Sequence, residues 1–139
     1  MAIASFLQLL RPQTLEDQRA LRVYRGHVEA ISTRVRDVYD SWNVAREIEP
    51  DYMRLANTAA VNRWELMRLA KQAERLHAPR MLGGTHKDLL AAVVASARAC
   101  QLLANGYRFH KSDAICDGQA MLVETKQALE DILLHVDSR

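Results

Sequence analysis

The chain has 139 residues, which suffices for one domain that buries its own core without a disulfide or a structural metal. Hydrophobic residues make up 49% of it and charged residues 26%, and this balance excludes an intrinsically disordered chain. The 19 Lys and Arg residues nearly offset the 17 Asp and Glu residues, so the net charge of +2 argues against nucleic acid as a default partner. With only five Gly and three Pro, turns are few and the elements are long, which favours helices.

The first twelve residues form an apolar segment that ends at Pro12 and contains Ile3, Phe6, Leu7, Leu9 and Leu10. No positive charge precedes these residues and no small-residue cleavage site is evident, which argues against a signal peptide. Because no apolar run reaches about 18 residues, we expect no transmembrane segment. The expected compartment is the cytoplasm by default, or an extracytoplasmic one if a leader or an anchor has been removed.

The first predicted helix runs from Thr14 to Glu49 and carries the clearest periodic signal of the chain. Thr14 with Asp17 resembles a capping box, with Asp in place of the usual Glu. At 1.5 Å per residue this helix is about 50 Å long, about two turns more than the helices that follow. Its apolar residues return every three or four positions, as heptads require: Leu21, Tyr24, Val28, Ile31, Val35, Val38, Trp42 and Ala45.

The second predicted helix runs from Asp51 to His77, with Pro50 suited to its first turn. Asn62 interrupts its apolar stripe, and a polar side chain there either marks a buried ligand site or sets the register of the helices. The stripe consists of Leu55, Ala59, Asn62, Leu66, Leu69, Ala73 and Leu76.

The third predicted helix starts after Gly84, with Thr85 and Asp88 as a second approximate capping box, and the fourth is capped by Ser112. Each has one apolar face, which needs a partner to exclude water. The third stripe consists of Leu90, Val93, Ala97, Cys100, Ala104 and Tyr107, and the fourth of Ile115, Gly118, Leu122, Thr125, Leu129, Ile132 and Val136.

Four such helices with short connections predict an all-α, antiparallel, up-down-up-down four-helix bundle. We assign residues 1–12 to the apolar N-terminal segment and residues 13–139 to this single domain. The long first helix overhangs its neighbours, so it bends, packs against the N-terminal segment, or packs against a second chain.

Catalytic motifs are missing from the sequence, so we expect no enzyme and no cofactor. The topology nevertheless gathers four of the five histidines at one end, where they offer a metal site with the nearby glutamate. The candidate ligands are His27, Glu74, His77, His86 and His135. A cluster that responds to pH is a variant of this interpretation. In the alternative interpretation these histidines lie on the surface or suit helix C-termini as cations.

Two further features concern thiols and surface charge. Cys100 and Cys116 have no metal-ligand spacing and fall in helical segments, so we expect inert buried thiols. The second helix is mainly basic and the fourth mainly acidic, an asymmetry that suits either a solvated surface or the orientation of a partner.

The second half of the chain carries a pattern of Ala, Leu, His and Gly at helical spacing: Leu76-His77-Ala78-Pro79, then His86 and Leu89-Leu90-Ala91-Ala92, then Asp117-Gly118 and Met121-Leu122-Val123. Over about residues 76–132 this pattern resembles uncharacterised helical-bundle domains of bacterial proteins, which are often secreted or lipid-anchored. The resemblance implies a bundle fold and no particular activity.

Together these patterns predict a non-enzymatic helical interaction or scaffold domain that forms a homo-oligomer. The expected contact surfaces are the first helix and the N-terminal segment, because their apolar residues exceed what one chain covers. The alternatives are a bundle that binds a small ligand or a metal at its histidine-rich end, and a sensory or envelope domain separated from its membrane anchor.

Overall fold

A computed structural model describes residues 14–138. Within that range the chain forms four long helices, α2 (Leu15–Ile48), α3 (Tyr52–Glu74), α4 (Gly83–Arg108) and α5 (Ser112–Asp137), with a short 3-10 helix η1 (Arg80–Leu82) before α4. No strand occurs between residues 14 and 138, so the predicted all-α class is confirmed. The predicted apolar segment, residues 1–12, lies outside the described residues.

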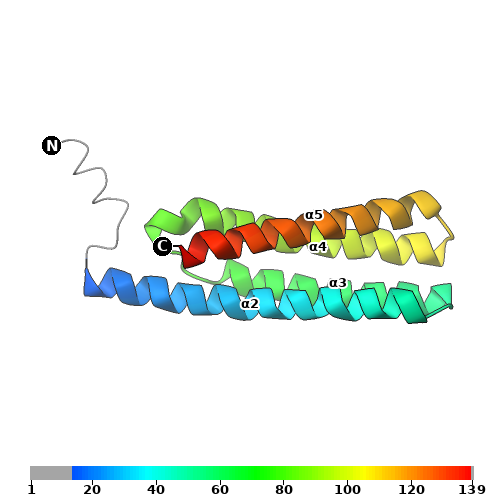
Figure 1. Ribbon diagram of the computed structural model, residues 1–139, viewed down its shortest axis with the longest axis horizontal. Coiled ribbons are helices and arrows are strands. Elements are labelled where there is room, and N and C mark those ends of the chain that lie inside the picture. The colour runs from blue at the N-terminus through cyan, green and yellow to red at the C-terminus, as the bar shows by residue number, and fades with distance from the viewer. Residues whose placement is uncertain (1–13, 139) are drawn as a thin grey trace.

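The four helices lie side by side along one long axis, and each reverses the direction of the one before it (Figure 1). α2 contacts α3 and α5, while α4 packs more extensively against α3 and α5. Figure 1 shows that the first turns of α2 extend beyond the ends of the other three helices. We call this the histidine end of the molecule, where α2 begins and α5 ends, and the opposite end the turn end.

The core forms where the predicted stripes meet, and most of their members are buried. Every stripe residue of the second helix is buried except Leu76, which is half-buried. In α2, however, Val38 and Ala45 are only half-buried, whereas Ser32 and Tyr39 are buried. A straight α-helix drifts by about 20° per heptad relative to a strict seven-residue repeat, so the core-facing side moves from Val38 toward Tyr39.

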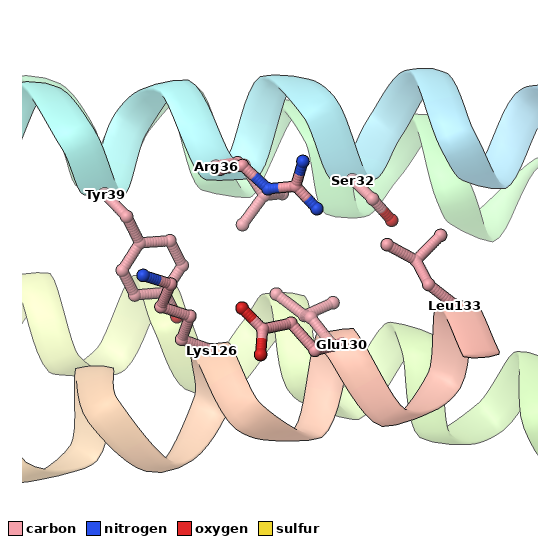
Figure 2. Close-up of a pocket in the computed structure, with 8 residues that line it drawn as sticks. Ser32, Arg36, Tyr39, Lys126, Glu130 and Leu133 are labelled. Carbon is pink, nitrogen blue, oxygen red and sulfur yellow. The ribbon is translucent and has the colours of Figure 1, made fainter.

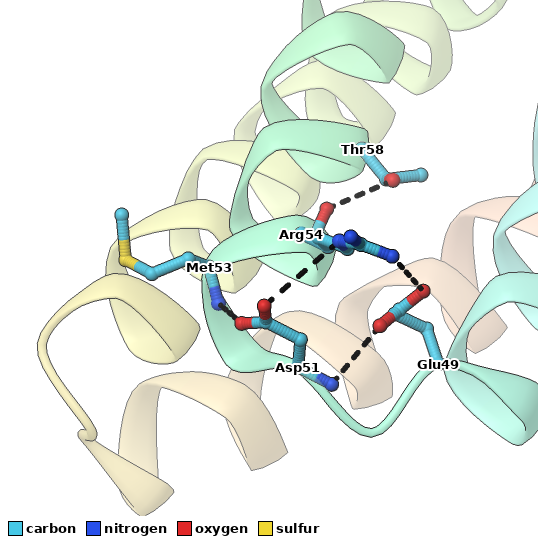
Figure 3. A network of polar contacts seen from close by, with 5 residues as sticks. All are labelled: Glu49, Asp51, Met53, Arg54 and Thr58. Carbon is cyan, nitrogen blue, oxygen red and sulfur yellow. Dashed lines mark hydrogen bonds and ion pairs between the residues drawn. The ribbon is translucent and has the colours of Figure 1, made fainter.

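The turn from α2 to α3 is held by carboxylates and one guanidinium (Figure 3). The Oδ1 atom of Asp51 accepts a hydrogen bond from the backbone N–H of Met53 at 2.9 Å, which makes Asp51 the N-cap of α3. Glu49 accepts from the backbone N–H of Asp51, and the guanidinium of Arg54 lies 3.9 Å from both carboxylates. Pro50 therefore precedes the cap and does not occupy the first turn of the helix.

The other helix ends agree with the predictions in part. Thr14 caps α2 as predicted, because its Oγ1 atom accepts from the backbone N–H of Asp17 at 3.0 Å. α3 ends at Glu74, three residues before the predicted end. The predicted caps of the last two helices are wrong: α4 already begins at Gly83 and α5 has Lys111 at its N-cap, and neither has a side-chain cap hydrogen bond.

In the α4–α5 turn, a backbone hydrogen bond takes the place of a polar side-chain cap. His110 adopts a left-handed conformation with φ of 54°, and the N–H of Lys111 donates to the carbonyl of Gly106 at 2.8 Å. This six-to-one hydrogen bond is that of a Schellman motif, which ends a helix by satisfying its last carbonyls. After this motif the chain reverses direction within a few residues, and α5 runs back along α4.

Two glycines let α4 and α5 approach closely. A Cβ atom on Gly118 would lie 2.8 Å from Cγ of Leu103 and 2.9 Å from the backbone oxygen of Ala99. At Gly106 an added Cβ would lie 2.7 Å from Cγ1 of Ile115. The two helices therefore touch through backbone at these levels, which any larger residue would prevent.

One segment, Arg80–Arg108, is long and apolar enough to cross a membrane by length and composition, with a mean hydropathy of 1.3. This finding qualifies the expectation from sequence that the chain has no such stretch. In the structure, 56% of that apolar window is buried against the other helices. Because α4 has neighbours on two sides, its high hydropathy is that of a core helix.

Candidate functional site

The histidine end does not assemble the predicted metal site. Within residues 14–138 there is no group of three or more His, Cys, Asp or Glu side chains that is able to hold a metal ion. Since α3 ends at Glu74, His77 is exposed in the linker that follows it. His27 lines a surface groove together with Arg34, whose positive charge disfavours a metal cation. His135 is also exposed on the last turn of α5.

His86 alone among the five candidates enters a specific contact. Its Nδ1 atom lies 2.9 Å from the hydroxyl of Tyr24, and the two rings meet edge to face with centroids 5.6 Å apart. Burial lowers the pKa of His86 and raises the pKa of Tyr24 to about 12. Both shifts favour neutral side chains, so this contact is a hydrogen bond between uncharged groups that fixes the start of α4 against α2.

A polar layer crosses the middle of the core. The hydroxyl of Tyr39 on α2 lies 2.8 Å from Oγ of Ser96 on α4 and also contacts Oγ1 of Thr125 on α5. Ser96 and Thr125 in turn reach the backbone carbonyls of Ala92 and Leu122. Three hydroxyl protons are available for these four contacts, so at most three of them are hydrogen bonds at any one time, and each hydroxyl has at least one partner. This layer ties three helices together at one level.

Next to the polar layer, a pocket opens along the line where α2 meets α5, which we call the α2–α5 seam (Figure 2). Polar and charged side chains approach it from both helices, and apolar side chains complete its wall. Its cavity volume is about 20 Å³, which is room for a single water molecule. The lining residues are Ser32, Val35, Arg36, Tyr39, Lys126, Leu129, Glu130 and Leu133.

Three buried side-chain polar atoms within residues 14–138 lack hydrogen-bond partners: Nε of the half-buried Arg25, and one atom each on Ser32 and Asn62 in the core. Ser32 is only 5% exposed and its Oγ atom, which faces the seam pocket, has no partner. Asn62 is 8% exposed and its Nδ2 atom has none either. A buried polar group without a partner is unfavourable by about 1–3 kcal/mol, so each such group calls for an explanation. Only Ser32 opens onto a described pocket.

The outer face of α3 carries an exposed tryptophan. Trp64 is 76% exposed, and it follows the buried Leu55 by nine residues, which places it about 180° around the helix from the core. Met53 and Val61 are also exposed along this face, and basic side chains flank it: Arg63, Arg68 and Lys71. The indole of Trp64 is thus exposed to solvent beside basic side chains, of which Arg68 is paired with the carboxylate of Glu65 at 2.6 Å.

A groove between α4 and α5 has the opposite charge. Its floor is made of small side chains, and the carboxylates of Asp88, Glu124 and Asp131 line it. Two acidic residues of α5, Glu124 and Asp131, therefore lie beside α4, whereas Glu130 of the same helix lines the α2–α5 seam.

The two thiols differ, which corrects the prediction that both are buried. Cys100 is buried in α4, and burial raises the pKa of its thiol to about 12. Cys116 is exposed near the start of α5. Only Cys100 therefore fits the description of an inert core thiol.

Comparison with protein-family models, with curated proteins and with solved structures finds no match for this chain. The expected resemblance to bacterial helical-bundle domains thus stays a prediction.

Three residues that define the outer face of α3 and the pocket in the α2–α5 seam were not predicted from the sequence. Trp64 stands outside the apolar stripe, and its place on a helical wheel opposite Leu55 was the available signal. Ser32 and Tyr39 were missed because a strict heptad runs through Val35 and Val38. Their seven-residue separation does place them on the same face of the helix, two turns apart.

Proposed function

We propose that this chain is an antiparallel, up-down-up-down four-helix bundle that serves as a non-enzymatic interaction domain and self-associates through the outer face of α3. The observation that carries the proposal is the 76% exposure of Trp64 on the side of α3 that faces away from the core. Tryptophan is enriched at the centres of protein interfaces, and an indole left in water gains free energy when a partner covers it.

The surroundings of Trp64 extend this surface along the helix. Met53 and Val61 are exposed, and Ala60 and Met67 are half-buried beside them. From Met53 to Met67 the stripe is about 21 Å long at 1.5 Å per residue. An exposed apolar stripe flanked by charged residues is typical of a contact surface for another helix.

A second copy of the chain is the partner that fits the charges best. Two-fold symmetric dimers are the commonest assemblies, and two α3 helices that cross antiparallel at Trp64 would place Val61 opposite Met67 and Asn57 opposite Lys71 of the second copy. The basic residues of the C-terminal half, Arg68 and Lys71, would then avoid each other. At the other half of the stripe, Glu49 and Asp51 surround the guanidinium of Arg54.

The surfaces first expected to mediate self-association receive less support. On α2, the exposed large apolar residues lie toward its two ends, with about 30 Å of helix between the two groups, so they do not form one continuous patch: Leu15 and Val23, then Val44 and Ile48. The apolar residues of the N-terminal segment lie outside the described part of the chain. We therefore assign the contact to α3.

Sedimentation velocity over a range of micromolar concentrations tests the proposal. We expect a concentration-dependent dimer, and we expect Trp64→Lys to weaken it by about 30-fold, as the loss of a central hot spot does. The matched control is Val123→Lys, because Val123 is 64% exposed on α5, away from this stripe. Thermal unfolding of both variants at low concentration checks that they fold.

Fluorescence offers a second readout, since Trp42 is buried and Trp64 is exposed. Iodide should quench the emission of Trp64 in the monomer and progressively less as the dimer forms. A monomer of 15.8 kDa at all concentrations would overturn the proposal. A dimer that the Trp64→Lys substitution leaves intact would also overturn the proposal. A third contrary result is a monomer whose Trp64 emission changes only when single-stranded nucleic acid is added.

A further inference from the structure

We propose that the groove between α4 and α5 binds the protruding start of α2 from a second copy of the chain. We call this protruding part, residues 15–23, the α2 overhang, because it precedes Tyr24, whose hydroxyl reaches His86 at the start of α4. The contact is separate from the outer face of α3, goes beyond the proposed function and does not depend on it. It rests on a free helical segment, on an acidic groove with a floor of small side chains, and on the opposite charges of the two.

The α2 overhang is a helix with one side free of the bundle. Its first turns extend beyond the ends of the other three helices (Figure 1). Leu15 is 64% exposed and Val23 is 59% exposed, and Arg19 and Arg22 between them are exposed as well. Their spacing of i, i+4, i+7 and i+8 places the four side chains on one side of the helix, away from the buried Tyr24. Two apolar side chains bury little area, so the charges decide which surface fits this one.

The groove between α4 and α5 has the shape and the size to receive a helix. Its cavity volume is about 520 Å³, which is room for several side chains. Because an alanine side chain is a single methyl group, a helix is able to approach this floor closely. A docked helix also keeps its own backbone hydrogen bonds, whereas an extended peptide would find no free backbone partner on the two helices. The floor consists of Ala91, Ala92, Ala95, Ala128 and Ile132.

Carboxylates line the groove and no basic side chain does. Asp88 belongs to α4, and Glu124 and Asp131 belong to α5. Within residues 14–138 none of the three forms an ion pair, and the amide of Gln127 is the one side-chain donor that reaches Asp131. The groove therefore offers three negative charges to an incoming surface.

The carboxylates are spread along the groove. Ser96 and Thr125 mark the same level of the two helices, because both contact one tyrosine hydroxyl. Asp88 lies about 12 Å from Ser96, and Asp131 lies about 9 Å from Thr125 in the same direction, so the two aspartates face each other across the groove. Glu124 is about 10 Å away from Asp131 along α5. No group of three such side chains within the described chain is able to hold one metal ion, so the groove suits separate cations carried on a common support.

The arginines of the α2 overhang match this arrangement. Arg19 and Arg22 lie about 60° apart around the helix, so each long side chain is able to reach a different wall of the groove. The exposed apolar side chains of the overhang then lie over the alanine floor. Of the two acids in the overhang, Asp17 lies on the opposite side of the helix from Leu15 and Glu16 lies at the flank, so the arginines dominate the charge of the docking face.

The contact is head to tail, because the overhang and the groove are different surfaces. Each bound pair leaves one overhang and one groove free, and such a contact continues into an open assembly unless its rotation closes a ring. Where the α3 contact also forms, the groove would join pairs of chains into a larger scaffold.

Mixing two variants tests the proposal. Both carry Trp64→Lys, which removes the α3 contact, so the Trp64→Lys protein is the reference. Arg19→Gln/Arg22→Gln neutralises the overhang, and Glu124→Gln/Asp131→Asn neutralises the groove. In sedimentation velocity at about 0.05 M salt, we expect the reference to form a series of oligomers and each neutralised variant to associate about tenfold more weakly. The equimolar mixture should form pairs and nothing larger, because only one complementary contact remains.

Matched controls remove the same charges elsewhere. Arg34→Gln/Arg36→Gln changes exposed residues of α2 beyond the overhang, and Glu130→Gln/Asp137→Asn changes α5 at the same seven-residue spacing outside the groove. Both should associate like the reference, and thermal unfolding checks that every variant folds. Raising the salt to about 0.5 M should weaken the groove contact about tenfold and leave the apolar α3 contact in place, so the failure of one proposal is distinguishable from the failure of the other.

Three results would overturn the proposal. The first is a Trp64→Lys protein that stays monomeric at all concentrations at low salt. The second is a mixture of the two neutralised variants that forms no pairs. The third is an equal loss of association in the matched controls, which would show that net charge, and not the groove, governs assembly. Association that needs the groove carboxylates but not the two arginines would also contradict it, because another basic surface would then occupy the groove.

Discussion

The two sides of α5 are built differently. Toward α4, the helix presents Gly118, and the backbones approach so closely that an added Cβ would lie 2.9 Å from a carbonyl oxygen. Toward α2, it presents Lys126, Leu129 and Glu130, and a pocket remains in the seam. The same helix thus takes part in one contact made by backbone and small residues and another made by long side chains and hydroxyls.

The difference shows how each contact is specified. Where backbones touch, packing alone fixes the register, because only one alignment brings glycine opposite the partner backbone. Where side chains keep the helices apart, the polar layer of Tyr39, Ser96 and Thr125 supplies the alignment, since its hydroxyls meet at one level only. The loosely packed contact is also the one that leaves a small cavity.

The largest effect is expected where the helices are closest. Gly118→Val would push Cβ and its methyl groups into Leu103 and the backbone of Ala99, so we expect the free energy of unfolding to fall by about 3 kcal/mol. Urea denaturation followed by circular dichroism measures this loss.

The control for that change is a glycine that contacts nothing. A Cβ atom at Gly26 on α2 would have no atom within 4 Å, so Gly26→Ala should raise the free energy of unfolding by about 0.5–1 kcal/mol through helix propensity alone. If both substitutions stabilised the protein, α4 and α5 would not approach as closely as described, and the contrast between the two sides of α5 would fail.

An intermediate effect is expected in the polar layer. Tyr39→Phe removes the hydroxyl that joins α2 to Ser96 and Thr125, and we expect a loss of about 1–2 kcal/mol. The loss stays moderate because both remaining hydroxyls keep a backbone carbonyl as acceptor. Tyr52→Phe is the matched control, since Tyr52 is 42% exposed, and it should change the free energy of unfolding little. Equal effects of the two substitutions would show that the layer does not align α2.

Most of the fold could be predicted from the sequence, and the close α4–α5 contact was easier to predict than the looser α2–α5 contact. Periodicity predicted four helices, and a glycine within a stripe of Leu and Ile, as at position 118, is typical of a close contact between helices. The seam was not predicted, because Ser32 and Tyr39 are core-facing only after the drift of a straight helix relative to the heptad. The predicted metal ligands at the histidine end do not come together, because α3 ends three residues before its predicted end. Topology fixes which helix ends lie together, but it does not fix where their side chains point.

The smallest effect is expected at the histidine end, where the hydroxyl of Tyr24 on α2 is hydrogen-bonded to the imidazole of His86 on α4. Burial lowers the folded-state pKa of His86 below its usual 6.5, so the unfolded chain takes up the proton first as the pH falls. The stability that the neutral imidazole contributes is therefore complete above pH 6.5 and is lost as the pH drops through the folded-state pKa.

We expect the urea midpoint to fall between pH 7.5 and pH 5, and to fall less in His86→Gln, which has no proton to gain. The other four histidines are common to both proteins, so the comparison isolates the contribution of His86. The effect is small because the imidazole of His86 is only half-buried. A midpoint with the same pH dependence in both proteins would mean that His86 is solvated alike in the folded and unfolded states. In that case α2 would be held at this end by Leu21 and Tyr24 packing alone, without a polar contact that titrates.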